Sequence, residues 1–417
     1  MPARRLIALL CLAVPVSSAA GAHPHAPGPH ELYMHVAGLT NDLARYQYLS
    51  EVVRGRDPAD RQLAGQLLAS TESELGLYDD AVRQFPFDNR DLPAPETLPR
   101  TDAWRAMDAA DAIVSLARDR RIVMVNEAHH DAHTRELTLE LLPRLRALGF
   151  THFAAEALSE RDDALAKRGY PIPASGSEYL REPLLGEIVR EALRLGFVVV
   201  PYDSASADNA VREADQARHL YQRVFAGHPG ARLFVHAGYA HIDKSTGRLG
   251  GIEPMAMQLR QLTGIEPLCI DQSQFRWVGY AYKADPYMQL VGDFDVRRPT
   301  VLVRRDGRQP WSSAPTRYDA SVILPPSGRW GRPRWLALGG LRRPHMVNTD
   351  LCRHTLPCVV EAHYPAEPDD AIPADRTTFL SDDRQATLYL RPGRYRLRAW
   401  DSLGRPLGER NVRVSPP

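Results

Sequence analysis

The sequence predicts an α/β domain whose mostly parallel sheet is covered by helices on both faces, preceded by a small helical subdomain and followed by a small β-sandwich. Three observations predict this arrangement. Residues 31–90 place apolar side chains at helical spacing, residues 102–270 alternate short apolar runs with amphipathic stretches, and residues beyond 341 read as short alternating strands. A chain of 417 residues is long enough for two or three cores. The expected segments are a signal peptide (1–22), a helical subdomain (23–94), the α/β domain (95–340) and the β-sandwich (341–417).

The first segment is typical of a cleaved signal peptide. Arg4 and Arg5 precede an apolar run from Leu6 to Val16, and small residues follow as far as Ala22. The run is too short to span a bilayer, and no later stretch approaches the roughly 18 apolar residues that a span needs. We therefore expect an exported protein, periplasmic or secreted, without a transmembrane anchor.

The second segment predicts helices that need another part of the chain to pack against. Apolar side chains recur near helical spacing in ELYMHVAGLTNDLARYQYLSEVV and ADRQLAGQLLASTESELGLYDDAVRQF. The second stretch resembles the joint of a helical-hairpin repeat, but a solenoid needs about three such repeats. We expect a small helical subdomain packed on the next part of the chain, with the proline-rich DLPAPETLPR as the linker.

The central segment predicts parallel strands joined by helices. Its apolar runs are RIVMV (121–125), THFAAEA (151–157), FVVVPYD (197–203) and ARLFVHAG (231–238). Between them lie stretches such as ELTLELLPRLRAL, whose leucines share one helix face before Gly149. Strand–helix alternation predicts right-handed crossovers within one sheet. RWVGYAY, TVLVRRDG and YDASVILPP are expected to complete that sheet or its antiparallel edge.

The C-terminal segment predicts antiparallel strands and a disulfide. PCVVEAHYP and QATLYLRPGRYRLRAW alternate apolar and polar residues, as in a β-sandwich, a class of domain that usually binds or supports. Cys352 and Cys358 enclose only RHTLP, so we expect a local disulfide in an oxidising compartment. Zinc is the weaker alternative because no second cysteine pair completes a ligand set. Cys269, in PLCID, is expected to be a buried free thiol.

Composition argues against two classes of partner. Lys and Arg total 52 against 51 for Asp and Glu, so no global charge draws the chain to nucleic acid or anionic lipid. Apolar residues at 44% and charged residues at 25% are typical of a folded chain. The partner we expect is a small-molecule or peptide substrate, and the sequence leaves the oligomeric state open.

Polar side chains follow each of the four central strands. In chain order they are Glu127, His129 and His130 within VNEAHHDAH, then Glu156, then Tyr202 and Asp203, then His241. Because the carboxyl ends of parallel strands meet at one edge of a sheet, where ligands bind, we expect these side chains to share one crevice. A buried carboxylate at Glu156 would need a partner or a function.

Spacing alone does not decide which imidazole of VNEAHHDAH faces the crevice. Asp131 is expected to cap the following helix, and His133 is expected to lie at the surface. His236 and His241 flank a glycine turn at the last strand, and one of the two is expected to be structural.

Two short motifs carry a resemblance to a known superfamily. They are Asn126-Glu127-Ala128-His129 and Gly238-Tyr239-Ala240-His241. They look like the two Gly-x-x-His motifs of the superfamily that groups erythromycin esterases, ChaN-like haem-binding proteins and Tiki/TraB proteins. Two further elements keep the same order, Ala155-Glu156 at a strand end and Arg212-Glu213 opening a helix. The resemblance covers about residues 120–245. It departs at Asn126, where the family usually has Gly, and we expect Asn126 to be a turn residue because Asn tolerates left-handed φ.

The resemblance implies hydrolysis in two branches, by a histidine base in the esterases and by a divalent metal in Tiki-like proteases. With a metal, His129, Glu156 and His241 would bind Mn, Co or Zn, and Glu127 would accept the proton of the bound water or orient a ligand. Without one, His129 or His130 would be the general base, and the Glu-x-x-His spacing of the esterase branch fits His130. We expect hydrolysis of an ester or amide bond and favour the metal-assisted version.

Two other functions compete. A ChaN-like haem- or metal-binding protein in iron uptake would use His129, His130 or Tyr239 as an axial ligand. A non-catalytic module would only bind a partner through its helical start and β-sandwich end. The segment 161–186 is long and rich in Gly, Pro and Ser, which is compatible with a lid over the crevice. The substrate itself is not identified by the sequence.

Overall fold

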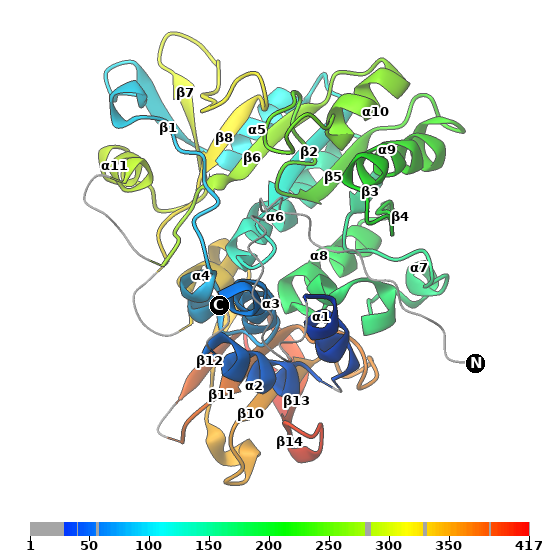
Figure 1. Cartoon of the computed structure of the whole chain (residues 1–417), viewed down its shortest axis with the longest axis vertical. Helices are drawn as coiled ribbons and strands as arrows, with labels where there is room; N and C mark the ends of the chain where they lie inside the picture. The colour runs from blue at the N-terminus through cyan, green and yellow to red at the C-terminus, as the bar shows by residue number, and fades with distance from the viewer. Residues whose placement is uncertain are drawn as a thin grey trace, which may run out of the picture. The chain divides into compact units, whose positions relative to one another are not determined.

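The computed structural model describes residues 29–39, 41–55, 58–279, 285–327, 332–382 and 385–416, which fall into two compact units (Figure 1). One unit is residues 89–327. The other combines the helices before residue 89 with residues 332–416. The expected signal peptide, residues 1–22, lies outside the described residues.

The first unit contains the predicted α/β sheet. Its elements are η1 (Pro95–Thr97), β1 (Trp104–Asp108), α5 (Ala109–Ala117), β2 (Ile122–Glu127), η2 (Ala132–Arg135), α6 (Glu136–Ala147), β3 (His152–Ala155), α7 (Leu165–Arg168), η3 (Pro173–Ser175), η4 (Glu178–Arg181), α8 (Pro183–Arg194), β4 (Val198–Pro201), α9 (Asn209–Leu220), η5 (Tyr221–Phe225), β5 (Leu233–Gly238), α10 (Met255–Thr263), β6 (Leu268–Phe275), α11 (Pro286–Asp293), β7 (Thr300–Arg304) and β8 (Ala320–Ile323). The eight strands lie in the order β1-β7-β8-β6-β2-β5-β3-β4. Neighbours from β8 to β4 are parallel, and β7 and β1 add an antiparallel edge. The predicted fold class is confirmed.

One predicted strand is wrong. RWVGYAY does not form a strand over residues 276–279, and its remainder lies outside the described residues. The strand is the preceding LCIDQSQF, β6, which is buried along its whole length. Four of its successive residues are polar, so it does not read as an apolar run. Their side chains make hydrogen bonds inside the protein, as Asp271 does with Asn126 at 2.7 Å, which offsets the cost of burying them.

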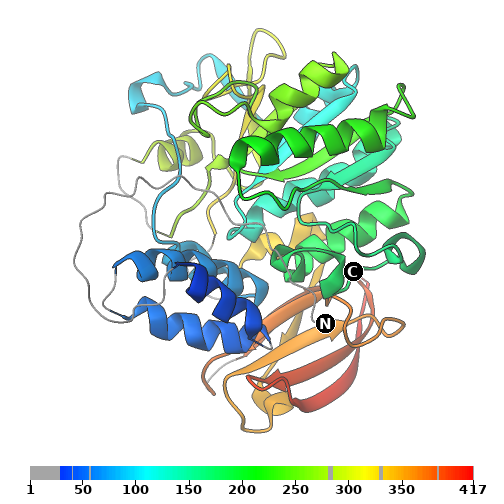
Figure 2. The ribbon, with the colours of Figure 1, turned by 45° about the vertical axis from the view of Figure 1, so that its right-hand side comes forward.

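The helices form one layer on each face of the sheet. The connections through α6 and α8 lead from β2 to β3 and on to β4, toward one edge, whereas those through α9 and α10 lead back from β4 to β5 and β6. Because such crossovers are right-handed, reversing their direction places the helices on the opposite face. Figure 2 shows α9 and α10 in front of the sheet and α6 behind it. The direction reverses between the neighbouring strands β2 and β5, and their carboxyl ends are where an α/β sheet opens a crevice.

The second unit joins helices and antiparallel sheets. Its elements are α1 (Pro29–Gly38), α2 (Asp42–Val53), α3 (Pro58–Glu74), α4 (Tyr78–Gln84), η6 (Arg334–Gly340), β9 (Arg343–Val347), η7 (Thr349–Cys352), β10 (Cys358–His363), β11 (Asp375–Phe379), β12 (Ala386–Leu390), β13 (Gly393–Asp401) and β14 (Pro406–Val414). One sheet has the order β11-β10-β13-β14 and the other pairs β12 with β9. Both contribute to one apolar core, Leu388 and Leu390 from the smaller sheet and Val360 and Leu397 from the larger.

Buried charges connect α2 and α3 to the larger sheet. Arg376 of β11 contacts Asp42 and Glu361, both at 2.8 Å, and Arg45 contacts Glu74 at 2.9 Å. Each of these side chains is less than a tenth exposed. The predicted helical segment and the predicted C-terminal strands therefore share one unit.

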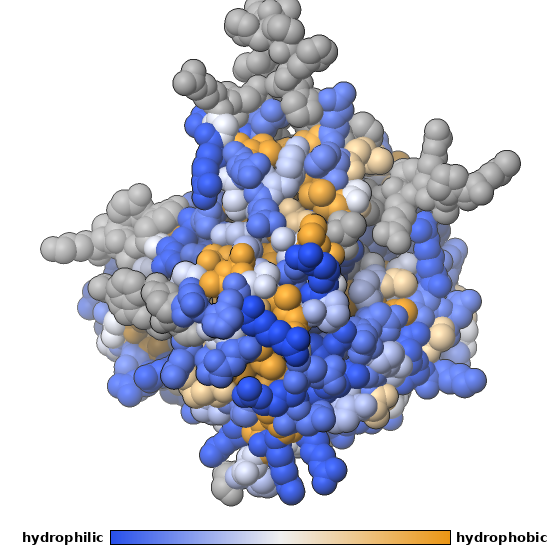
Figure 3. Space-filling view, turned by 90° about the horizontal axis from the view of Figure 1, so that it is seen from below, coloured by the Kyte–Doolittle hydropathy of each residue, from blue (hydrophilic) through white to orange (hydrophobic). Residues whose placement is uncertain are grey.

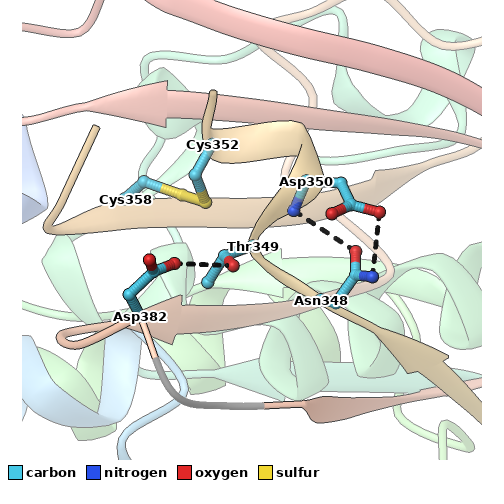
Figure 4. Close-up of a disulfide and its surroundings, with 6 residues drawn as sticks. All are labelled: Asn348, Thr349, Asp350, Cys352, Cys358 and Asp382. Carbon is cyan, nitrogen blue, oxygen red and sulfur yellow. Dashed lines mark hydrogen bonds between the residues drawn. A yellow bond between two sulfur atoms is a disulfide. The ribbon is translucent and has the colours of Figure 1, made fainter. Parts of the chain in front are cut away.

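The predicted disulfide is present. Cys352, at the end of η7, is bonded to Cys358, the first residue of β10, with their Cα atoms 5.9 Å apart (Figure 4). The short η7 is capped by the Asn348 side chain, which accepts a hydrogen bond from the Asp350 amide at 3.3 Å. Cys269 is a buried free thiol, as expected.

The surface shows few large apolar side chains. The face in Figure 3 is hydrophilic over most of its area, with small separate apolar patches. The exposed examples include Met346 and Leu403, at 57% and 68%, and scattered residues of this kind are ordinary on protein surfaces. None of the helices among the described residues is long and apolar enough to cross a membrane.

Candidate functional site

The candidate site lies where β2 and β5 end side by side. Glu127, the last residue of β2, is in register with Gly238, the last residue of β5. The Tyr239 amide then donates to the Glu127 carbonyl at 2.9 Å, which ties the two strand ends together. Side chains that come after both strands are thus brought to the point where the crossover direction reverses.

Glu127 is the centre of the first cluster. Its Oε1 accepts a hydrogen bond from Nδ1 of His129 at 2.6 Å, and its Oε2 accepts from Nε of Arg135 at 2.6 Å and from Nε2 of His236 at 3.0 Å. Burial by itself would raise the pKa of Glu127, but Arg135 and His236 outweigh burial and hold that pKa well below its ordinary value. Glu127 is therefore an ionised acceptor at neutral pH.

The hydrogen-bond partners fix where the protons of the two histidines lie. Because Glu127 can only accept, Nδ1 of His129 carries a proton, and Nε2 is the ring nitrogen that Glu127 does not bind. His236 donates through Nε2, so its Nδ1 accepts from the Thr138 hydroxyl at 2.9 Å. His236 is thus the structural histidine of the last strand, as one of the pair was expected to be.

Nε2 of His129 points toward Gly238 and Glu156. A Cβ on Gly238 would lie 2.5 Å from Cε1 of His129 and 3.1 Å from Oε2 of Glu156, so all three residues meet at this glycine. One face of the imidazole is stacked on Tyr179, with ring centroids 4.2 Å apart and planes 6° apart. The edge of Tyr239 lies at 5.2 Å and 89°. Of the two adjacent histidines, His129 is the one that faces Glu156.

Glu156 is the centre of the second cluster, one residue beyond β3. Its Oε1 accepts from Nη2 of Arg212 at 2.6 Å and lies 3.4 Å from Nε2 of His241, and its Oε2 accepts from the Gly238 amide at 2.6 Å. Nδ1 of His241 lies 2.6 Å from Glu213. Burial would lower the pKa of His241, but Glu213 and Glu156 raise it to about 10. His241 is therefore a cation at neutral pH.

The remaining expected site residues support this second cluster. Arg212, near the start of α9, also forms a two-point ion pair with Asp203, with both distances 3.0 Å. Burial and the charge of Glu156 raise the pKa of Asp203, and Arg212 opposes them. Tyr202 belongs to the apolar core, and its hydroxyl donates to the His236 carbonyl at 3.2 Å. Asp203 and Arg212 thus hold Glu156 in place, while Tyr202 packs behind the site.

His130 contacts the side chain of Tyr239. Its Nδ1 lies 3.1 Å from the Tyr239 hydroxyl. Burial and the charge of the nearby Arg276 lower the pKa of His130 well below its ordinary value, so it stays neutral.

Two expectations about VNEAHHDAH are wrong. Asn126 is not a turn residue with left-handed φ, because it is a fully buried residue of β2. Nδ2 of its side chain donates to the Tyr239 carbonyl at 2.8 Å, and its Oδ1 accepts from the backbone amide of Gln272 at 2.8 Å. The positive φ of this region, 38°, belongs to Tyr239 instead. His133 is not at the surface, since it is 2% exposed and its Nε2 lies 3.1 Å from Glu136. Asp131 does cap η2, as expected.

Three contributors were not expected from the sequence. Arg135 is fully buried and also binds Glu182 at 2.9 Å. Glu182 caps α8 by accepting from two backbone amides, and an acidic residue before Pro183 is a helix-start signal that pointed to this cap. Tyr179 comes from η4, within the segment 161–186. No sequence signal marks Arg135 or Tyr179.

The expected metal ligands do not fit a cation in this arrangement. His241 is protonated between two carboxylates, and both oxygens of Glu156 already accept hydrogen bonds, from Arg212 and from a backbone amide. Within the described ranges, no group of three or more His, Cys, Asp or Glu side chains is arranged to hold a metal ion.

Comparisons with known proteins add partial likenesses only. No family model matches the chain, and no curated protein matches it. One solved structure described as "Bacterial protein toxins" shares 17% identity over 52% of this chain and 46% of its own, with a TM-score of 0.31. The type III effector HopBA1 shares 17% over 44% of this chain and 87% of its own, with a TM-score of 0.30. RRSP, a MARTX toxin effector domain from Vibrio vulnificus, shares 14% over 54% and 45%, also at 0.30. The chain thus spans less than half of the first of these, and TM-scores this low carry no conclusion about function.

Proposed function

We propose that the α/β unit hydrolyses an ester or amide bond of a small-molecule or peptide substrate, with His129 as general base and Glu127 as the carboxylate that orients it. The observation that carries this proposal is the 2.6 Å hydrogen bond from Nδ1 of His129 to an ionised Glu127, which leaves Nε2 basic. A base held by an orienting carboxylate is the arrangement that activates water or a hydroxyl for attack on a carbonyl.

The proposed hydrolysis uses only these residues, one water molecule and the substrate. Nε2 of His129 takes a proton from water as the water oxygen bonds to the carbonyl carbon. The carbonyl π bond opens and its oxygen becomes an oxyanion. When the tetrahedral intermediate collapses, the bond to the leaving group breaks, and the leaving alcohol or amine takes the proton back from His129. Glu127 stays ionised throughout and stabilises the imidazolium that forms between the two steps.

We assign stabilisation of the oxyanion to the second cluster, whose two cations are each paired with carboxylates. His241 and Arg212 are the two cations of this cluster, and both are held by Glu156. Preorganised charge in a buried site stabilises a developing oxyanion more than the same charge in water. We assign Glu156 and Glu213 to keeping His241 protonated and in position. The resemblance of the two motifs to the esterase and Tiki superfamily supports hydrolysis at the level of sequence.

The protein is proposed to act outside the cytoplasm. The disulfide between Cys352 and Cys358 and the signal-peptide pattern of residues 1–22 support export.

The test compares three variants of the full chain on a panel of esters and peptides. His129→Ala and Glu127→Gln are expected to lower kcat, by roughly 100- to 10,000-fold for the loss of a general base. The control is His228→Ala, because His228 is exposed and outside the site. Equal activity in His129→Ala and the control would refute His129 as the base, and no activity of the wild type on the panel would support the non-catalytic module. Loss of activity on chelation, restored by Mn, Co or Zn, would favour the metal-assisted version, and a Soret band that disappears in His129→Ala would favour haem binding.

A further inference from the structure

Tyr179 is the aromatic residue stacked on one face of the His129 imidazole. His129 is only 6% exposed, whereas Tyr179, stacked on its face, is partly exposed. The neighbours of the imidazole described above, Glu127, Glu156, Gly238 and Tyr239, come from the ends of the sheet strands. Tyr179 is the neighbour that comes from the segment between β3 and α8.

That segment is fastened at both ends. Near β3, the Ser159 amide donates to the Ser175 carbonyl and the Ser177 amide donates to the Ala157 carbonyl, both at 2.8 Å. At the other end, Glu182 caps α8 and binds Arg135, which also binds Glu127. Tyr179 therefore lies three residues from a side chain that shares Arg135 with the carboxylate of the base.

We propose that Tyr179 is a positioning residue for His129 and forms the entrance wall of the site. Its ring holds the imidazole in the plane in which Nδ1 meets Glu127, and it keeps solvent from the base until the substrate takes its place. The positioning role rests on the proposed function of His129. The shielding role does not, since it concerns only the burial of the imidazole.

Shielding is tested without any substrate. Diethyl pyrocarbonate modifies unprotonated imidazole nitrogens, and fragmentation of the labelled peptide distinguishes His129 from His130. We expect Tyr179→Ala to raise the modification rate of His129 roughly three- to tenfold, which is the scale of losing one aromatic contact, and Tyr179→Phe to leave it near the wild-type rate. Tyr170→Ala is the matched control, because Tyr170 lies in the same segment but packs against Arg168.

Two outcomes would overturn the shielding role. One is an equal rate for His129 in Tyr179→Ala, Tyr170→Ala and the wild type. The other is a rise in Tyr179→Phe as large as in Tyr179→Ala, because the phenylalanine ring preserves the stack. If circular dichroism shows that Tyr179→Ala is unfolded, Tyr179→Leu keeps most of the apolar volume and takes its place.

Positioning is tested with the hydrolysed substrate. We expect Tyr179→Ala to lower kcat and to shift the lower limb of the pH profile of kcat/KM, with both restored in Tyr179→Phe. A change in KM alone would assign Tyr179 to substrate binding and overturn the positioning role. If the wild type hydrolyses nothing on the panel, the proposed function fails, and the modification rates still decide the shielding role.

Discussion

Gly238→Ala is the sharpest test of the geometry at the meeting point of the two clusters. The φ of Gly238 lies outside the left-handed region, so its backbone conformation accepts an alanine. The new Cβ would lie 2.5 Å from Cε1 of His129, whereas non-bonded carbons rest about 3.5 to 4.0 Å apart. Tyr179 already occupies one face of the imidazole, and the ring has to move by about 1 Å away from the new Cβ.

Such a movement acts on both clusters at once. It lengthens the 2.6 Å bond from His129 to Glu127, and the same methyl group presses on Glu156 at 3.1 Å. A misplacement of about 1 Å at a reacting group lowers the rate by about 100-fold. Overpacking a well-packed site costs about 1 to 3 kcal/mol of the free energy of unfolding, so the variant should stay folded and lose most of its activity.

The assay measures kcat/KM on the best substrate of the panel, together with urea unfolding. Gly227→Ala is the control, because a Cβ there would meet nothing within 4 Å. We expect the control to keep the wild-type kcat/KM. If Gly238→Ala also keeps activity within about twofold, a change of under 0.5 kcal/mol in the activation free energy, then His129 in the position described is not the base.

Two further predictions concern charge, and a third concerns metal. Folding raises the pKa of His241 from 6.5 to about 10, so its ion pairs stabilise the fold fully below pH 6.5 and lose that effect as the pH rises through 10. The melting-temperature difference between the wild type and His241→Gln should therefore shrink from pH 6 to pH 10. A difference that stays constant over this range would contradict the charge assigned to His241. Glu182→Gln removes one of two carboxylates from the buried Arg135 and should lower the free energy of unfolding by about 3 to 5 kcal/mol. The control Glu140→Gln changes a part-exposed pair and should lower it by under about 1 kcal/mol. Equal urea midpoints for the two variants would refute the role of Glu182. Dialysis against EDTA should leave kcat unchanged, and a loss that added Mn, Co or Zn restores would overturn the metal-independent mechanism.

Much of the fold and the location of the site could be predicted from local patterns. Apolar runs such as RIVMV mark buried parallel strands, and the polar residues after them, Glu127 and Glu156 among them, had to meet at one edge. The four strand ends were therefore correctly predicted to form one neighbourhood. The sequence could not predict that His129, and not His130, faces Glu156. Adjacent residues point to different sides of the chain, and the sequence does not say which of these sides faces the site.

Arg135 and Asn126 were misjudged for one physical reason, which is that the partners of their buried polar groups lie far away in the sequence. Arg135 is buried because Glu127 and Glu182 lie on either side of it, the second 47 residues away. Asn126 is a strand residue because β6 supplies hydrogen-bond partners about 146 residues further along. Each looks like a surface or turn residue by its type alone, since the partner that compensates its burial is invisible in the local sequence.

The discontinuous second unit has a consequence for synthesis of the chain. Asp42 of α2 and its partner Arg376 of β11 are 334 residues apart. Ribosomes add about 5 to 20 residues per second, so the helix leaves the ribosome roughly 20 to 70 s before the strand that neutralises its buried carboxylate. The whole α/β unit is made within that interval and can fold first. We expect nascent chains stopped before β11 to protect the central sheet from protease while their N-terminal helices are still cleaved.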